Sequence, residues 1–419
     1  MLNRKEQPEL VPIDSVNFIA PKIYEIEEGI HLFHMKEVPN ETTRFDLYFD
    51  AGKCAKNKGI PAFVNGLLLS GTEKKTSNEI NEEINGLGGF YEAGVAMENA
   101  VVSMFCLNEN LLPIFNILHD SISNLAFIEH EVEQFLSDRK QSYKISLEKV
   151  SVLAQRKFQN ALFASNDNYS YITSLEDIEN VKIEDLREFH SKHYLKGLKK
   201  VVVVGDVDEN TIHQIIEQVR KLSSKHTTEL EKNLSNSKGL QHVPKDKAVQ
   251  SAIRVGRTLF NKTHEDYIDF LVLNTLLGDY FGSRLMSNIR EDKGYTYGIG
   301  SMLAEFANTG YFLIATEVGV DVKDLAIAEI KSELTRLQTE LVSEVELAVV
   351  KNYMLGQLLK SADGPYAMTD LFLSAEAQGL ELDFYNKVIK RLNDVDPERI
   401  QSLAKKYLNW DEMTIVTAG

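Results

Sequence analysis

The fold is decided by two stretches of sequence, Val181-Lys-Ile-Glu-Asp-Leu and, 214 positions later, Val395-Asp-Pro-Glu-Arg-Ile. The first is followed by a helical pattern, by Tyr194 and by the apolar run Val201-Val-Val-Val-Gly205. The second is followed in the same order by a helical pattern, by Tyr407 and by Ile415-Val-Thr-Ala-Gly419. A shared order of elements, at an offset near half the chain length, is typical of an internal duplication. The sequence therefore predicts two copies of one α+β unit of roughly 200 residues.

Strand-like and helix-like patterns alternate through both halves. Residues that alternate apolar and polar predict strands, and apolar residues three to four positions apart predict helices. The predicted strands are 22–27, 30–35, 44–50, 90–107, 200–204, 251–259, 294–302 and 309–317. The predicted helices are 59–69, 76–86, 108–124, 129–163, 184–194, 267–277, 321–337 and 343–360. The fold class is α+β: two homologous domains, each a mostly antiparallel β-sheet covered on one face by helices.

One segment interrupts this order. Residues 223–250 are rich in Ser, Lys, Asn and Glu and have little periodicity, which is typical of a linker. We therefore predict an N-terminal domain over residues 1–222, a linker over 223–250 and a C-terminal domain over 251–419.

Composition excludes several classes of protein. The 419 residues contain 62 Asp and Glu against 46 Lys and Arg, a net charge of −16, so the chain lacks the basic surface of a nucleic-acid binder. Two cysteines, Cys54 and Cys106, are too few for a disulfide framework. No signal-peptide pattern opens the sequence, and no apolar run is long enough to span a bilayer. We expect a cytoplasmic protein without nucleic-acid or membrane partners.

The histidines offer weak metal candidates. His190 and His193 lie three apart on a predicted helix, which could place two imidazoles on one metal; without a third ligand, a solvated helix face is the better interpretation. His31 and His34 point to opposite faces of a strand. The stretch that begins at His130 has Gln134 where a His-Glu-x-x-His zinc helix requires its second histidine.

Several different short motifs follow one another in a specific order and spacing along the two halves. They are Asp50-Ala-Gly52, Gly59–Thr72, Gly88-Gly89, Ser174-Leu-Glu-Asp-Ile, Asp185–Tyr194, Val204-Gly-Asp206, Gly282-Ser-Arg-Leu285 and Ile289–Tyr297. In this arrangement the chain resembles the pitrilysin/insulinase-type metallopeptidases over essentially its whole length. It is similar in particular to their half-length branch, which includes the mitochondrial processing peptidase and the core subunits of the respiratory cytochrome bc complex.

The resemblance implies a degenerate zinc site in the N-terminal domain. Active family members have His-x-x-Glu-His on the helix that matches Gly59–Thr72: the two histidines bind zinc and the glutamate is the general base. The matching positions here are Ala62, Asn65 and Gly66. A downstream glutamate, the family's third ligand, would fall near Tyr143, and no glutamate lies between Glu133 and Glu148. The expectation is that this chain holds no metal and no cofactor.

A second catalytic element of the family is retained in the C-terminal domain. Arg290 and Tyr297 match the pair that, in the family, holds the substrate backbone and donates a hydrogen bond to the oxyanion of the tetrahedral intermediate. The alternative is that Arg290 belongs to a charged helix end capped by Gly294, while Tyr297 packs in a strand.

These features together predict a non-catalytic subunit of a two-chain peptidase. It would form a heterodimer with a zinc-bearing family member of similar length, supply Arg290 and Tyr297 to that partner's site, and bind unfolded peptides. One alternative is a purely structural subunit without a proteolytic role; another is an enzyme of unrelated chemistry, for which no set of residues presents itself. The segment Leu276–Gly282 is shorter than the glycine-rich loop of the processing peptidase's non-catalytic subunit, so presequence-type recognition is not implied.

Overall fold

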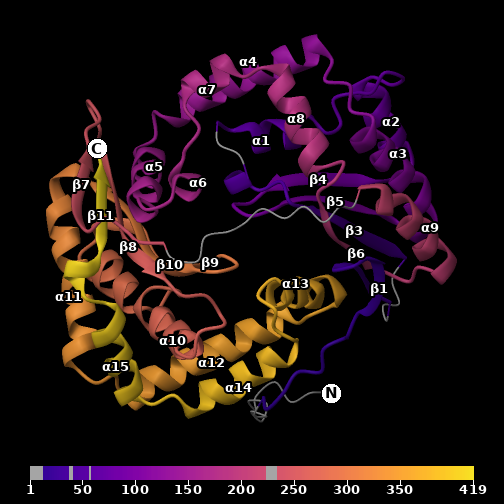
Figure 1. The fold of residues 1–419 in the computed structure, drawn as a ribbon. Coiled ribbons are helices and arrows are strands. Elements are labelled where there is room, and N and C mark those ends of the chain that lie inside the picture. The colour runs from indigo at the N-terminus through magenta and orange to yellow at the C-terminus, as the bar shows by residue number, and fades with distance from the viewer. Residues whose placement is uncertain (1–12, 37–40, 56–57, 223–233) are drawn as a thin grey trace, which may run out of the picture.

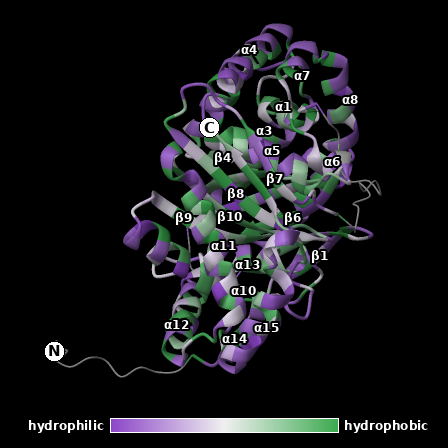
Figure 2. Cartoon of the chain, turned by 90° about the vertical axis from the view of Figure 1, so that its left-hand side faces the viewer, coloured by the Kyte–Doolittle hydropathy of each residue, from purple (hydrophilic) through white to green (hydrophobic). Residues whose placement is uncertain are grey.

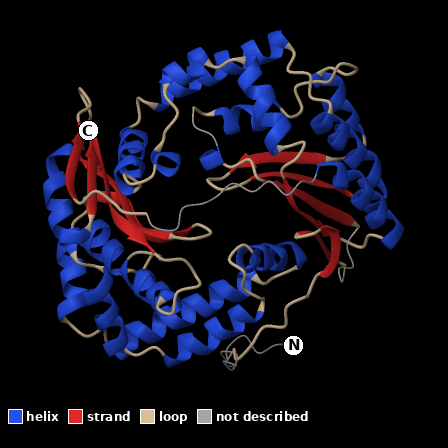
Figure 3. Cartoon of the chain, in the orientation of Figure 1, coloured by secondary structure: helices blue, strands red, loops and turns tan. Residues whose placement is uncertain are grey.

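A computed structural model describes residues 13–36, 41–55, 58–222 and 234–419. The described chain is built around two β-sheets, one from each half, with helices outside them (Figures 1 and 3). Within the described ranges, no helix has the length and apolar character needed to cross a membrane. Cys54 and Cys106 are both buried and unpaired.

The first sheet has six strands in the order β1-β2-β6-β3-β5-β4. All neighbours are antiparallel except β2 and β6, which run parallel. The central strand β6 is almost entirely apolar and buried, as expected for a strand covered on both faces. The strands are β1 (Lys22–Glu27), β2 (Ile30–Met35), β3 (Thr42–Phe49), β4 (Phe90–Val95), β5 (Ala100–Leu107) and β6 (Leu198–Val204).

The second sheet repeats this topology without a counterpart of β1. Its order is β7-β11-β8-β10-β9, and the only parallel pair among its described strands, β11 with β7, corresponds to β6 with β2. Helix α15 (Pro397–Tyr407) lies 214 positions after α8 (Ile183–His193) at both ends. The strands are β7 (Gly239–Val243), β8 (Gln250–Leu259), β9 (Thr296–Glu305), β10 (Gly310–Gly319) and β11 (Thr414–Ala418). The predicted α+β class with two homologous sheets is confirmed.

The predicted linker over 223–250 is too long. Residues 223–233 lie outside the described residues, but Gly239–Val243 is strand β7 and pairs in parallel with β11. Strand β7 is a short edge strand with mostly exposed residues. Because such a strand buries no apolar face, its sequence lacks the alternation of apolar and polar residues that predicts a strand.

Each sheet buries one face against helices of its own half. The first core joins the sheet to α1, α2, α3, α8 and α9, and the second joins its sheet to α10, α11, α12, α14 and α15. Figure 2 shows hydrophobic residues along β8 and β10. The remaining helices are α1 (Ile60–Leu67), α2 (Ser77–Gly86), α3 (Leu111–Ser123), α4 (Glu129–Ser146), α5 (Val150–Leu162), α6 (Asp167–Ser170), α7 (Leu175–Asn180), α9 (Glu209–Val219), α10 (Tyr267–Leu277), α11 (Lys323–Thr339), α12 (Glu344–Ser361), α13 (Pro365–Glu376) and α14 (Asp383–Asp394).

The opposite faces of the sheets are covered by an exchange of helices between the halves. Helix α5, from the first half, packs through Phe158 and Leu162 on β8 and β11 of the second sheet. Helix α13, from the second half, packs through Phe372 and Leu373 on the first sheet, where Phe33 and Phe372 meet edge to face at 5.0 Å. Figure 1 shows both helices on the inner side of the molecule. This exchange fastens the two halves together.

One predicted helix is divided in the structure, and another is confirmed together with its cap. The predicted helix 129–163 is two helices, α4 and α5, separated at Leu147–Lys149. The break allows α5 to leave the first half and reach the second sheet. The predicted helix beginning near Thr76 is confirmed with its cap: the Thr76 hydroxyl accepts from the Glu79 amide, and the Glu79 carboxylate accepts from the Thr76 amide.

Candidate functional site

The degenerate zinc positions lie on α1, a helix that is buried along one face. Gly59, with φ of +75°, precedes it in the left-handed region that favours glycine, and Pro61 stands in its first turn. Asn65 is only 5% exposed, and its Nδ2 donates to the Tyr194 hydroxyl at 3.1 Å. The residue at the position of the general base therefore makes a structural bond between α1 and the end of α8.

An aromatic ring lies against the position of the second zinc-binding histidine. A Cβ atom at Gly66 would lie 2.6 Å from a ring carbon of Phe135, which projects from α4. The Phe135 ring meets Phe63 edge to face at 6.4 Å, and the Arg139 guanidinium lies 4.9 Å from its centre on another side. A histidine at residue 66, an exposed position, would therefore have to displace the Phe135 ring.

The expected position of the third zinc ligand is next to a cation. The Tyr143 hydroxyl on α4 accepts a hydrogen bond from Arg156 Nη2 at 3.0 Å, and the Arg156 guanidinium lies 5.1 Å from the centre of the Tyr143 ring. Among the residues that the structure describes, no group of three or more His, Cys, Asp and Glu side chains could hold a metal ion. A guanidinium beside the position would also repel Zn²⁺. The residues present therefore do not fit zinc.

We expect Gly66→His to lower the free energy of unfolding by roughly 1–3 kcal/mol, because the new side chain must displace the Phe135 ring. Chemical denaturation of the isolated chain measures this. Gly356→Ala is the matched control: Gly356 also lies inside a helix, α12, but nothing lies within 4 Å of its added Cβ. That variant should gain about 0.5–1 kcal/mol, since glycine destabilises a helix interior. Equal stabilities of Gly66→His and wild type would show that the site is open.

Arg290 and Tyr297 lie in the second half, on either side of a turn. Arg290 is half-buried in a π-helix over Met286–Asp292, and its guanidinium lies 4.7 Å from the centre of the exposed Phe281 ring. Gly294, with φ of +65°, ends this helix as the alternative interpretation expected. Tyr297 does not pack against the sheet: it is 94% exposed at the start of β9. Its hydroxyl makes no hydrogen bond to any described residue.

The histidine candidates have structural roles. His190 and His193 are buried, which corrects the expectation of a solvated helix face: His190 Nε2 contacts the Ile122 carbonyl at 2.8 Å, and His193 Nδ1 contacts the Asp50 carbonyl. Burial lowers the pKa of His190 and keeps its ring neutral near pH 7. His34 is buried and contacts the Gly205 carbonyl at 3.1 Å. His130 is an exposed side chain at the start of α4.

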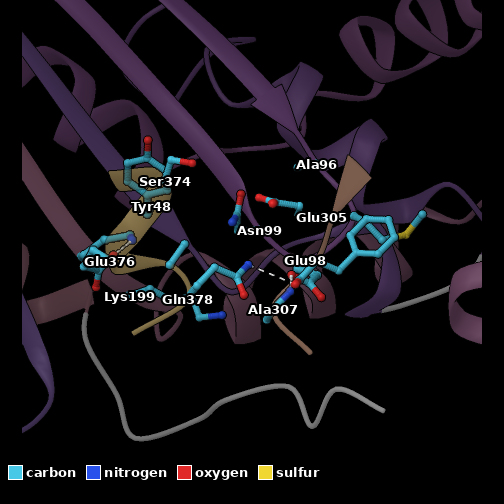
Figure 4. A pocket seen from close by; sticks show the side chains of 14 residues that line it. Tyr48, Ala96, Glu98, Asn99, Lys199, Glu305, Ala307, Ser374, Glu376 and Gln378 are labelled. Carbon is cyan, nitrogen blue, oxygen red and sulfur yellow. Dashed lines mark hydrogen bonds and ion pairs between the residues drawn. The ribbon is translucent and has the colours of Figure 1, made fainter. Parts of the chain in front are cut away.

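A cavity of about 470 Å³, which no sequence pattern indicated, lies where the two halves meet. Its lining includes Glu98 and Lys199 from the first half and Glu305 and Gln378 from the second (Figure 4). The Glu98 carboxylate accepts from the Ala307 amide at 2.8 Å and from the Tyr169 hydroxyl at 2.7 Å. The turn between β4 and β5 thereby contacts its counterpart between β9 and β10. Residues so distant in sequence share no local pattern, so only the fold identifies this contact.

Two models of one protein family match the chain. Residues 34–171 match the model described as insulinase (peptidase family M16), and residues 180–354 match the model described as peptidase M16 inactive domain. An uncharacterized zinc protease of Rickettsia felis is 26% identical over 317 residues, which cover 74% of this chain and 75% of that protein. The mitochondrial-processing peptidase subunit beta of Rattus norvegicus is 25% identical over 415 residues, covering 90% and 80% of the two chains.

The fold agrees with these relatives. A crystal structure of a peptidase M16 inactive domain from Pseudomonas fluorescens superposes with a TM-score of 0.85 at 20% identity, over 95% of this chain and 98% of that one.

The fold and the site define a duplicated metallopeptidase scaffold whose metal position carries no ligand set. The family matches extend over both halves of this scaffold. The chain belongs to the insulinase-type peptidase family M16, and its residues 180–354 match the family's inactive domain.

Proposed function

We propose that this chain is a catalytically incomplete subunit of a two-chain zinc metallopeptidase. The observation that carries the proposal is the contrast between its two halves. The metal position of the first half has no ligand set, with the Phe135 ring against residue 66 and Arg156 close to residue 62, whereas Tyr297 of the second half presents an unengaged hydroxyl to solvent. The Tyr297 hydroxyl can stabilise a transition state only next to a catalytic metal. Because this chain has no metal site, another chain would have to supply that metal.

Arg290 and Tyr297 would act in the partner's site. The Tyr297 hydroxyl would donate to the oxyanion that forms when zinc-bound water attacks the peptide carbonyl, which is the kind of contact that lowers a barrier most. Arg290 would hold the substrate backbone. The stacking of its guanidinium on Phe281 restricts the arginine and reduces the entropy lost on binding.

The proposed substrate is an unfolded peptide. Each sheet ends in an edge strand, β4 in the first and β9, which carries Tyr297, in the second. An extended peptide can add to such an edge through backbone hydrogen bonds. A net charge of −16 favours peptides that carry basic residues. The zinc would be in the partner alone, and a cytoplasmic location remains a prediction.

A purely structural subunit is the second candidate. The lack of a zinc ligand set in this chain favours the structural role as much as it favours the first proposal, because neither role needs zinc here. The two differ in Tyr297, for which a structural subunit has no use.

Co-expression with a family member of similar length that contains His-x-x-Glu-His tests the proposal. The isolated chain should hold no stoichiometric zinc by elemental analysis and should not cleave a quenched peptide. Mixed with the partner, it should elute as a heterodimer by size-exclusion chromatography with light scattering, and peptide cleavage should appear or increase. Separate elution at micromolar concentration, with no gain in cleavage, would favour the structural candidate.

A further inference from the structure

A second, smaller cavity borders the degenerate zinc site. It has a volume of about 190 Å³, and its lining includes Ala62 from α1, Tyr143 from α4, and Arg156 and Gln159 from α5. Lys53, which directly follows the motif Asp50-Ala-Gly52, also lines the cavity. The cavity therefore lies beside the positions at which active relatives bind their metal.

The charges that line this cavity are positive. Among its lining residues the charged side chains are Lys53 and Arg156, and no carboxylate is present. A neighbouring hollow shares Arg156 and Tyr171 with it, adds Lys157, and is also lined without a carboxylate. A third hollow that shares Tyr171 is lined by Glu176, Asp177 and Asp185 together with Lys58. The two hollows around Arg156 differ from it, and from a chain with 62 acidic and 46 basic residues, in having three cations and no acid in their lining. Such a surface attracts anions.

The guanidinium of Arg156 is fixed by neutral partners. Its Nη2 donates to the Tyr143 hydroxyl and to the Thr173 carbonyl, each at 3.0 Å, while its guanidinium stacks on the Tyr143 ring. No described carboxylate forms an ion pair with Arg156, and neither Nε nor Nη1 donates to a described residue. Arginine binds carboxylates through two parallel hydrogen bonds. Since a guanidinium fixed by neutral partners keeps its charge uncompensated, it favours an anionic ligand.

We propose that this cavity binds the C-terminal carboxylate of a peptide. The proposal rests on the proposed function only in taking a peptide as the ligand. A volume of about 190 Å³ accommodates a carboxylate and one small side chain, given that a liquid water occupies about 30 Å³. The preceding residues of the peptide would lie past Tyr171 in the neighbouring hollow. The proposed anion site would thus lie beside the former metal position.

Binding of two fluorescein-labelled pentaalanine peptides to the isolated full chain tests this. One peptide has a free C-terminal carboxylate and the other a C-terminal amide, and fluorescence anisotropy gives both affinities. The acid should bind at least about 10-fold more tightly, since hydrogen bonds between a guanidinium and a carboxylate are roughly twice as strong as those between neutral groups. Arg156→Gln should bring the ratio of affinities close to one. Arg139→Gln, which changes the arginine stacked on Phe135 outside the cavity, should leave the ratio unchanged.

The ratio is measured within each preparation, so a loss of stability in Arg156→Gln does not obscure it. If that variant fails to fold, Lys53→Gln replaces it: Lys53 has an exposed side chain, and its removal should reduce the ratio several-fold. Inorganic phosphate is added as a competitor to distinguish a free anion from a peptide terminus. Equal affinities of acid and amide, no binding of either, or displacement by phosphate without any preference for the acid would each overturn the proposal. None of these outcomes involves a partner chain, so they leave the heterodimer test untouched.

Discussion

Replacing Tyr297 with Phe should reduce peptide turnover of the reconstituted pair by roughly 100- to 1000-fold, which is the usual effect of removing one oxyanion donor. The substitution keeps the ring and deletes only the hydroxyl. Because that hydroxyl is exposed and has no described partner, the melting temperature of the chain should not change. Turnover number and KM are measured with the variant chain and an unmodified zinc-bearing partner. A donor that acts in the transition state lowers the turnover number more than it raises KM.

Tyr295→Phe is the matched control for this prediction. Tyr295 lies two residues earlier and packs partly against the second core, so it is not placed to act in a partner's site. Its variant should retain turnover within about two-fold. If the pair with Tyr297→Phe keeps full turnover, the role assigned to Tyr297 is wrong, and the structural candidate gains support.

Asp266→Asn should lower the free energy of unfolding at pH 7 by about 2–3 kcal/mol. Asp266 is only 2% exposed and stands before α10, where it accepts hydrogen bonds from Arg399, Lys406 and Tyr407 of α15. Breaking a buried ion pair typically costs about 3–5 kcal/mol. We expect the lower figure here because Arg399 and Lys406 remain partly exposed and can be hydrated.

The difference between Asp266→Asn and wild type should depend on pH. Burial raises the pKa of Asp266, but the hydrogen bonds from Lys406, Tyr407 and Arg399 outweigh it, so the folded pKa lies well below the ordinary value of 3.8. A depressed folded pKa means that the stabilisation is complete above the unfolded pKa and is lost as pH falls below it. Thermal unfolding from pH 7 to pH 3 should therefore show the two curves converging below about pH 4.

Asp383→Asn serves as the control for this cluster. Asp383 pairs with Lys387 at 3.2 Å on the surface of α14, with both side chains more than half exposed. Such a pair contributes about 0–1 kcal/mol, so its loss should change the melting temperature little. A similar small effect of Asp266→Asn would mean that the cluster does not fasten α10 to α15.

The sequence predicted the duplicated fold through local patterns, and it predicted the loss of the zinc ligands through the family resemblance of its short motifs. The period-two and helical patterns located most strands and helices, and the 214-residue offset between Val181 and Val395 predicted the second copy. The resemblance aligns residues 62, 65 and 66 with two zinc ligands and the general base of the family, and their identities here are Ala, Asn and Gly. Neither inference requires knowing which distant side chains meet.

Only the tertiary structure decided what replaces the metal. Phe135 and Arg156 reach α1 from α4 and α5, and nothing in the local sequence of either helix indicates that its side chains close or charge this position. The same holds for the exchange of α5 and α13 between the sheets, since an amphipathic helix specifies an apolar partner but not which one. Burial of His190 and exposure of Tyr297 were likewise set by how the elements pack. The periodicity of the sequence determines which face of a helix or strand is apolar. Long-range packing determines which residues that face, and each polar side chain, will contact.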